Sequence, residues 1–214
     1  MSEPARPRFR RPAMLDPAAA DQIPGGLDPA AQAELAHTSA GALVARARDR
    51  AADDPALVQR LLDLVEAEGV DTLATLWAAA PPDSLPGALW RVYMLREWVR
   101  RDPITVSERY KTGVIHQQVA RVVAGAQHPP GPPEMTALAD QVLSGLFTGD
   151  LDVALGRAAA FARILATGSA FEADWIEDHH PADAAALTRR ASSLLATAEA
   201  LESAARQWRL GVLE

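Results

Sequence analysis

Apolar positions along this chain recur at helical spacing. After residue 133, apolar residues fall three or four positions apart, on one face of a helix: Met135, Leu138, Ala139, Val142, Leu143, Leu146 and Phe147. A second run alternates steps of four and three over about three heptads: Leu187, Ala191, Leu194, Ala198, Leu201, Ala205 and Trp208. Because helical bundles use the same spacing, packing within one chain explains this seam better than a dimer does. These patterns predict an all-α protein.

Asp-Pro pairs at Asp28-Pro29, Asp54-Pro55 and Asp102-Pro103 mark three helix starts. Asp accepts hydrogen bonds from free backbone N–H groups, and Pro has no N–H to leave unpaired. The predicted helices run over about 29–51, 55–68, 72–80, 86–101, 103–124, 134–148, 151–167 and 181–208. Gly113 would divide the fifth helix in two, whereas Gly69, Gly149 and Gly168 would each end a helix. We therefore expect a bundle of eight or nine helices.

Proline-rich segments suggest how the chain is organised. Residues 1–27 contain five prolines and little periodicity, which predicts a disordered N-terminal arm. Residues 126–133 contain four prolines, which argue against helix in the segment from Gln127 to Pro133 and predict a hinge. The hinge would join an N-terminal helical part, 28–125, to a C-terminal helical part, 134–214, packed as one domain or as two sub-bundles.

Residues 86–101 combine aromatic and basic side chains. Their apolar residues circle nearly the whole helix axis, which is typical of a helix buried among other helices. Trp90, Tyr93 and Trp98 would then be packing anchors of a central helix. Arg91 and Arg96 do not share a face with the two arginines at the end of this helix. If buried, they need acceptors, either an anionic ligand or internal carboxylates such as Glu97, Asp63 or Glu66.

Composition and charge exclude some kinds of chemistry and disfavour some kinds of partner. The formal charge is −7, and residues 134–214 account for −6 of it, which disfavours binding of nucleic acid or anionic membranes by the molecule as a whole. The chain has no cysteine, which excludes disulfides and thiolate chemistry. We find no signal-peptide pattern and no apolar run of about 18 residues, so we expect a cytoplasmic protein without a membrane anchor.

The N-terminal arm is the first candidate binding site. It places four arginines around one aromatic residue: Arg6, Arg8, Phe9, Arg10 and Arg11. An extended arm of this kind can contact nucleic-acid phosphates or an acidic protein surface, with the aromatic ring stacking or filling a pocket. A solubilising tail is the other interpretation.

Metal and catalytic signatures are sparse. Two Glu-x-x-His pairs, Glu34 with His37 and Glu177 with His180, match half of the ligand pattern of di-iron bundles. His180 precedes Pro181, where helical geometry is disfavoured, so we expect no metal site and no cofactor. Serine-hydrolase, phosphate-loop and zinc-protease motifs are all missing from the sequence, and we predict no catalytic residue.

Two stretches carry a resemblance to a protein family. Leu85 to Pro103, LPGALWRVYMLREWVRRDP, and Leu138 to Gly168, LADQVLSGLFTGDLDVALGRAAAFARILATG, cover about a quarter of the chain. They are similar to an uncharacterised family of small actinobacterial helical proteins, some of which carry the label RNA polymerase β subunit. The resemblance implies a helical fold and an association with transcription, and it brings no catalytic residues.

Together these observations predict a non-enzymatic helical interaction protein that binds another macromolecule, with transcription or nucleic-acid machinery as the class of partner that the resemblance implies. Nucleic acid would bind through the arm, and the protein would be a monomer or a homodimer. The alternative is a helical protein or enzyme that binds a small molecule or a metal, with Arg91 or Arg96 holding an anion.

Overall fold

The computed structural model describes residues 28–47, 70–116, 130–144 and 150–214. Within these ranges the chain forms seven α-helices and no strand. They are α2 (Pro29–Ala47), α4 (Val70–Trp77), α5 (Leu85–Arg101), α6 (Pro103–His116), α7 (Pro132–Leu143), α8 (Leu151–Ile176) and α9 (Pro181–Leu210). The all-α prediction is confirmed, while the expected eight or nine helices become seven in the described residues. The helix expected at 55–68 and the arm, 1–27, lie outside them.

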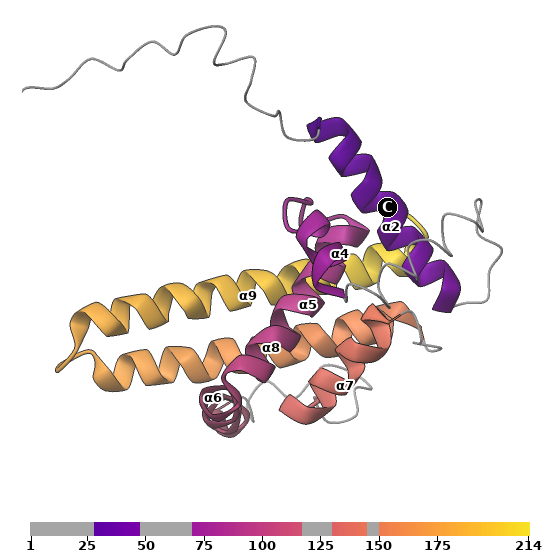
Figure 1. The fold of residues 1–214 in the computed structure, drawn as a ribbon. Helices are drawn as coiled ribbons and strands as arrows, with labels where there is room; N and C mark the ends of the chain where they lie inside the picture. The colour runs from indigo at the N-terminus through magenta and orange to yellow at the C-terminus, as the bar shows by residue number, and fades with distance from the viewer. Residues whose placement is uncertain (1–27, 48–69, 117–129, 145–149) are drawn as a thin grey trace, which may run out of the picture.

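A long antiparallel hairpin formed by α8 and α9 is the main feature of the fold (Figure 1). The helices α5, α6 and α7 pack against α8, whereas α2 and α4 lie near the C-terminal end of α9, far from the α8–α9 turn (Figure 1). No described helix is both long enough and apolar enough to span a membrane.

The predicted central helix is α5, which contacts all six of the other described helices. Leu89, Val92 and Tyr93 are buried, and Trp90 and Trp98 pack against the core from partly buried positions. The same core contains Met135 from α7, so apolar residues from both sides of the expected 126–133 hinge share one cluster. The aromatic residues of α5 therefore act as packing anchors.

Two of the three Asp-Pro helix starts fall in the described residues, and both form as predicted. The Asp28 carboxylate accepts a hydrogen bond from the backbone N–H of Ala30 at 3.2 Å, and the Asp102 carboxylate accepts one from Thr105 at 3.2 Å. The third pair, Asp54-Pro55, lies outside the described residues. Of the proline-rich segment, Pro132 and the proline after it form the first turn of α7, so the expectation that this segment cannot be helical is wrong at its end. Proline has no N–H to pair and is favoured in the first helical turn.

Gly113 and Gly168 correct two predicted boundaries. Helix α6 runs through Gly113, and α8 continues past Gly168 to Ile176, nine residues beyond the predicted end at 167. A Cβ atom on Gly113 would lie 2.1 Å from the carbonyl oxygen of Ile164, and one on Gly168 would lie 2.0 Å from that of Arg109. Both glycines therefore let α6 and α8 approach closely and do not interrupt either helix. The other two predicted stops, Gly69 and Gly149, lie outside the described residues.

The heptad seam of α9 faces α8 within the same chain. Ala191, Leu194, Ala198, Leu201 and Ala205 are buried, and Trp208 packs against the core. Alanine at alternate seam positions allows the two helix backbones to lie close together. The seam is thus occupied by an intramolecular neighbour.

Candidate interaction surface

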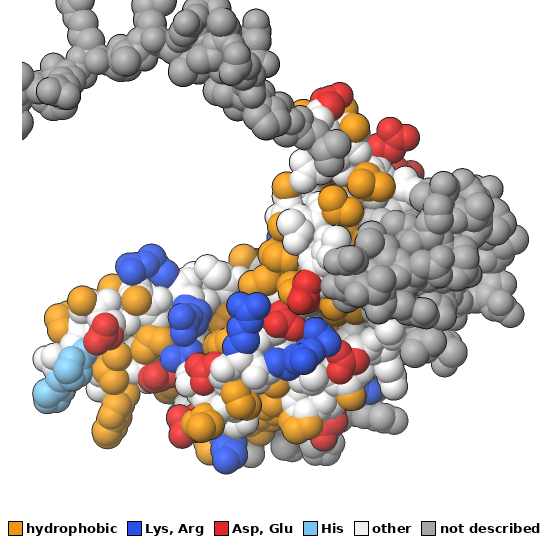
Figure 2. Space-filling model, viewed as in Figure 1, with side chains coloured by type: hydrophobic (Ala, Val, Ile, Leu, Met, Phe, Trp, Pro, Cys, Tyr) orange, Lys and Arg blue, Asp and Glu red, His pale blue; other side chains and the backbone are white. Residues whose placement is uncertain are grey.

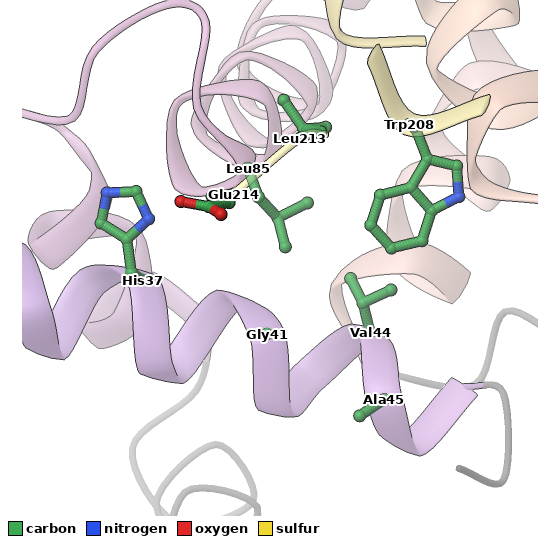
Figure 3. A pocket seen from close by; sticks show the side chains of 8 residues that line it. All are labelled: His37, Gly41, Val44, Ala45, Leu85, Trp208, Leu213 and Glu214. Carbon is green, nitrogen blue, oxygen red and sulfur yellow. The ribbon is translucent and has the colours of Figure 1, made fainter. Parts of the chain in front are cut away.

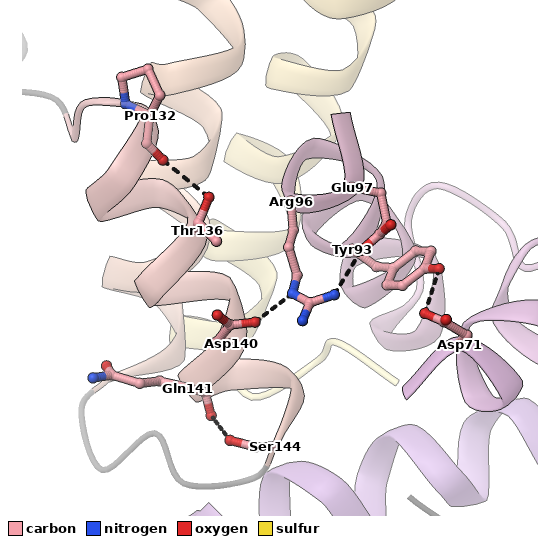
Figure 4. Close-up of polar contacts among 9 residues, drawn as sticks. All are labelled: Asp71, Tyr93, Arg96, Glu97, Pro132, Thr136, Asp140, Gln141 and Ser144. Atoms are coloured by element: carbon pink, nitrogen blue, oxygen red, sulfur yellow. Dashed lines mark hydrogen bonds and ion pairs between the residues drawn. The ribbon is translucent and has the colours of Figure 1, made fainter. Parts of the chain in front are cut away.

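The two arginines of α5 have internal partners. Arg96 forms ion pairs with Glu97, at 2.7 Å, and with Asp140 of α7 (Figure 4). Arg91 is half-buried and donates a hydrogen bond to the carbonyl oxygen of Gly87 at 2.8 Å, and burial lowers the pKa of its guanidinium. The Glu97 contact was anticipated, whereas Asp140, 44 residues away in sequence, was not. Arg96 is therefore neutralised by the protein itself.

A third arginine, which sequence analysis did not single out, is more deeply buried. Arg109 is 6% exposed and donates to both carboxylate oxygens of Glu172, at 2.6 and 3.4 Å. The guanidinium carbons of Arg109 and Arg190 lie 6.0 and 5.9 Å from the centre of the Trp98 ring, close enough for cation–π attraction. This cluster links α5, α6, α8 and α9, and a buried cation with its own carboxylate indicates a structural role.

Tyr93 joins α5 to α4. Its hydroxyl donates a hydrogen bond to the Asp71 carboxylate at 2.8 Å (Figure 4). Burial and this hydrogen bond raise the pKa of Tyr93 to about 12, because both favour the neutral phenol. The contact is therefore another internal link between helices.

The four candidate metal ligands are not brought together. Glu34 and His37 belong to α2, whereas Glu177 and His180 lie in and beside the α8–α9 turn, at the other end of the hairpin (Figure 1). Among the described residues, no group of three or more His, Cys, Asp or Glu side chains is arranged to hold a metal ion. A di-iron centre built from the two pairs has no geometric support.

A cavity of about 340 Å³ lies between α2, the start of α5 and the C-terminal end of the chain (Figure 3). Its lining residues are His37, Gly41, Val44, Ala45, Leu85, Trp208, Leu213 and Glu214. Most of this lining is apolar, and none of these side chains is a hydroxyl or amine nucleophile. Neither Arg91 nor Arg96 lines it, so it is separate from the predicted anion site.

The most unusual surface lies at the C-terminal end of α8. Trp175 is 86% exposed and Phe171 is 41% exposed, and the two residues are one helical turn apart. The Phe171 ring stacks on His116 of α6, with ring centres 3.6 Å apart, and the neighbouring Ile115 is also exposed. We call Ile115, His116, Phe171, Trp175, Asp174 and Asp178 the tip surface. Figure 2 shows hydrophobic side chains projecting from this end of the hairpin, next to histidine side chains.

Negative charge surrounds these rings. Phe171, Asp174 and Trp175 stand at helical spacings of three and four, which places them on one face of α8, and Asp178 follows in the turn after the helix ends at Ile176. Between residues 170 and 188 the chain has five acidic residues and no Lys or Arg. One of the five, Glu172, is paired with Arg109, and the exposed Lys111 lies one turn before Ile115 on α6. The tip surface therefore keeps an excess of negative charge.

The tip surface was not among the predicted sites, because the predicted helix ended at residue 167. Extending the helix through Gly168 places Phe171 and Trp175 on one face with Asp174, and this spacing is visible in the sequence. The basic arm, Arg6 to Arg11, lies outside the described residues.

The described residues form an all-α fold with an exposed surface that carries aromatic and acidic side chains. No protein-family model, curated protein or solved structure matches this chain. The function must therefore be argued from the chemistry of the surface itself.

Proposed function

We propose that this protein is a non-enzymatic interaction protein whose tip surface binds a basic polypeptide segment of another macromolecule. One observation carries the proposal: Trp175 is 86% exposed beside the partly exposed Phe171, on a face that also presents Asp174, and the exposed Asp178 follows in the next turn. Large aromatic side chains are the usual anchors of protein interfaces.

The energetics support an anchor at this position. Burying an aromatic side chain of this kind removes about 150–250 Å² from water, which corresponds to roughly 4–6 kcal/mol at 25 cal/mol per Å². Because Trp175 stays exposed in the folded protein, folding gains little of this free energy from its ring. A partner that covers the indole ring would gain it, less the cost of ordering both chains.

Charge selects the class of partner. Asp174 and Asp178 repel phosphate groups, so nucleic acid and anionic lipid are poor partners for this face. A segment with Lys or Arg next to an apolar side chain matches both the rings and the carboxylates. Proteins of the nucleic-acid machinery often carry such segments, which links the surface to the partner class that the sequence resemblance implies.

Site-specific photocrosslinking in cells tests the proposal. A benzophenone amino acid replaces Trp175 in one variant and Val153, which is 54% exposed near the other end of α8, in the control. We expect crosslinks from position 175 to peptides of another protein that contain excess Lys and Arg, and fewer of them in high salt. Equal crosslinking from the two positions, or crosslinked peptides without a basic excess, would refute the proposal.

A further inference from the structure

The chain contains a segment that matches the tip surface. Residues 1–14 carry four arginines against one acidic residue, and Phe9 stands in the middle of the arginines. The tip surface presents the complementary set, with two exposed aromatic rings, the exposed Asp174 on the same helix and the exposed Asp178 in the turn that follows. Opposite charge and a shared need to bury aromatic surface bring such groups together.

We propose that the arm of one copy, Arg6 to Arg11, docks on the tip surface of a second copy. In this contact Phe9 packs against the ring of Trp175, and the arginines pair with Asp174 and Asp178. The inference rests on one part of the proposed function, that the tip surface binds a basic segment, and it names the arm of a second copy as that segment.

The dimensions of the molecule favour a second copy over the chain's own tip. Helix α9 has 30 residues and is about 45 Å long. The first described helix, α2, lies near the C-terminal end of α9, far from the α8–α9 turn beside the tip surface (Figure 1), so an arm that precedes α2 would have to run back along the hairpin. Seventeen residue steps join Arg11 to Asp28. Any chain of that length spans at most about 58 Å, and a random coil of that length averages about 23 Å.

Reaching its own tip would therefore require an extension well beyond this average of about 23 Å, because the hairpin helix α9 that the arm would have to follow is about 45 Å long. The tip surface of a second copy can be reached without this stretching, because the second copy can approach the arm. Two copies can exchange arms reciprocally, which closes a dimer with two identical contacts.

A mixing experiment with full-length variants tests the inference. One variant carries Arg8→Glu and Arg10→Glu in the arm, and the other carries Trp175→Ala at the tip. We expect the wild type to associate in analytical ultracentrifugation at low salt and each variant alone to be monomeric. Their mixture should form a heterodimer, since one partner supplies an intact arm and the other an intact tip.

A peptide provides a second readout that does not depend on the folding of either variant. Residues 2–14 as a free peptide should change the tryptophan fluorescence of the full-length arm variant, and we expect at least a tenfold weaker affinity when Phe9 and the four arginines are replaced by alanine. A Trp175→Gln substitution in the arm variant should remove most of the fluorescence change. Circular dichroism checks that all variants are helical.

The possible results separate the two proposals. A monomeric wild type, association unaffected by either variant, or a peptide that does not bind would each overturn arm docking. If arm docking fails while position 175 still crosslinks to basic peptides of another protein, only the further inference is refuted. If position 175 crosslinks to residues 2–14 of this chain alone, arm docking is supported and binding to a different macromolecule is refuted.

Discussion

The close approach of α6 and α8 predicts that one added methyl group is enough to destabilise the fold. In Gly168→Ala the new Cβ would lie 2.0 Å from the carbonyl oxygen of Arg109 and 2.8 Å from the carbonyl carbon. Carbon–oxygen contacts across helix interfaces are normally at least about 3.3 Å long, so the helices would have to separate locally by about 1.3 Å. The neighbour is backbone and cannot rotate away.

The magnitude follows from two opposing terms. Overpacking a tight interface costs about 1–3 kcal/mol, and a backbone neighbour places this site at the upper end. Replacing glycine by alanine within a helix gains up to about 1 kcal/mol. The free energy of unfolding of Gly168→Ala should therefore fall by about 2 kcal/mol, which corresponds to a melting temperature roughly 4–8 °C lower for a chain of this size.

The matched control is Gly156→Ala in the same helix, because nothing lies within 4 Å of a Cβ added there. This control should be stabilised by about 0.5–1 kcal/mol through helix propensity alone. Urea unfolding monitored by circular dichroism measures the free energy of unfolding of both variants. We expect the urea midpoint to change while the dependence of that free energy on urea concentration stays constant. If Gly168→Ala were as stable as Gly156→Ala, the close crossing would be refuted.

A double variant sharpens the same test. In Gly113→Ala the new Cβ would lie 2.1 Å from the carbonyl oxygen of Ile164, at the same helix crossing. This substitution should lower the free energy of unfolding by about as much as Gly168→Ala does. Once one substitution has separated the helices, the second meets less resistance. The two together should therefore destabilise by less than the sum of the single effects, and strict additivity would mean that the two glycines act independently.

Three further predictions concern buried polar groups. Ser39→Ala should destabilise by about 1–3 kcal/mol in urea unfolding, since the Trp77 indole N–H donates to the Ser39 hydroxyl at 3.0 Å and would lose its buried partner. Glu172→Ala should lower the free energy of unfolding by roughly 1–3 kcal/mol in the same assay, because it removes the carboxylate that pairs with the buried guanidinium of Arg109. The loss stays moderate because Glu172 is 42% exposed and water can reach the site. In Tyr110→Phe, which leaves Tyr93 as the one tyrosine, absorbance at 295 nm should show Tyr93 ionising near pH 12. The stability that its neutral phenol contributes is fully present below pH 10 and is lost as the pH rises to 12, and a midpoint near 10 would contradict this.

Much of the secondary structure was predictable because it depends on local chemistry. Helix starts at Asp28 and Asp102 follow from side-chain capping, which requires only neighbouring residues. The central position of α5 followed from its nearly continuous apolar circumference, because such a helix has to be surrounded by others. The partner of Arg96 in α7 was not predictable, since it depends on how two separate helices are placed.

The tip surface, too, was predictable in part from the sequence and in part depended on tertiary packing. Its aromatic and acidic residues have a helical spacing that the sequence displays, but the interpretation depended on whether the helix continues past Gly168. The exposure of Trp175 is a tertiary property, because an indole ring in a helix of this composition would normally be expected in the core. Only the packing of α6 and α9 around α8 shows that no other helix among the described residues covers Trp175.

The sequence by itself determined that this is a helical protein, where several helices begin and which seam joins α9 to its neighbour. Whether a glycine ends a helix or allows two helices to cross closely depended on the tertiary structure. A glycine is compatible both with a helix end and with a close helix crossing, and local propensity does not distinguish the two. At Gly113 and Gly168 the carbonyl group of a neighbouring helix occupies the space of a side chain, and this contact exists only once α6 and α8 have packed together.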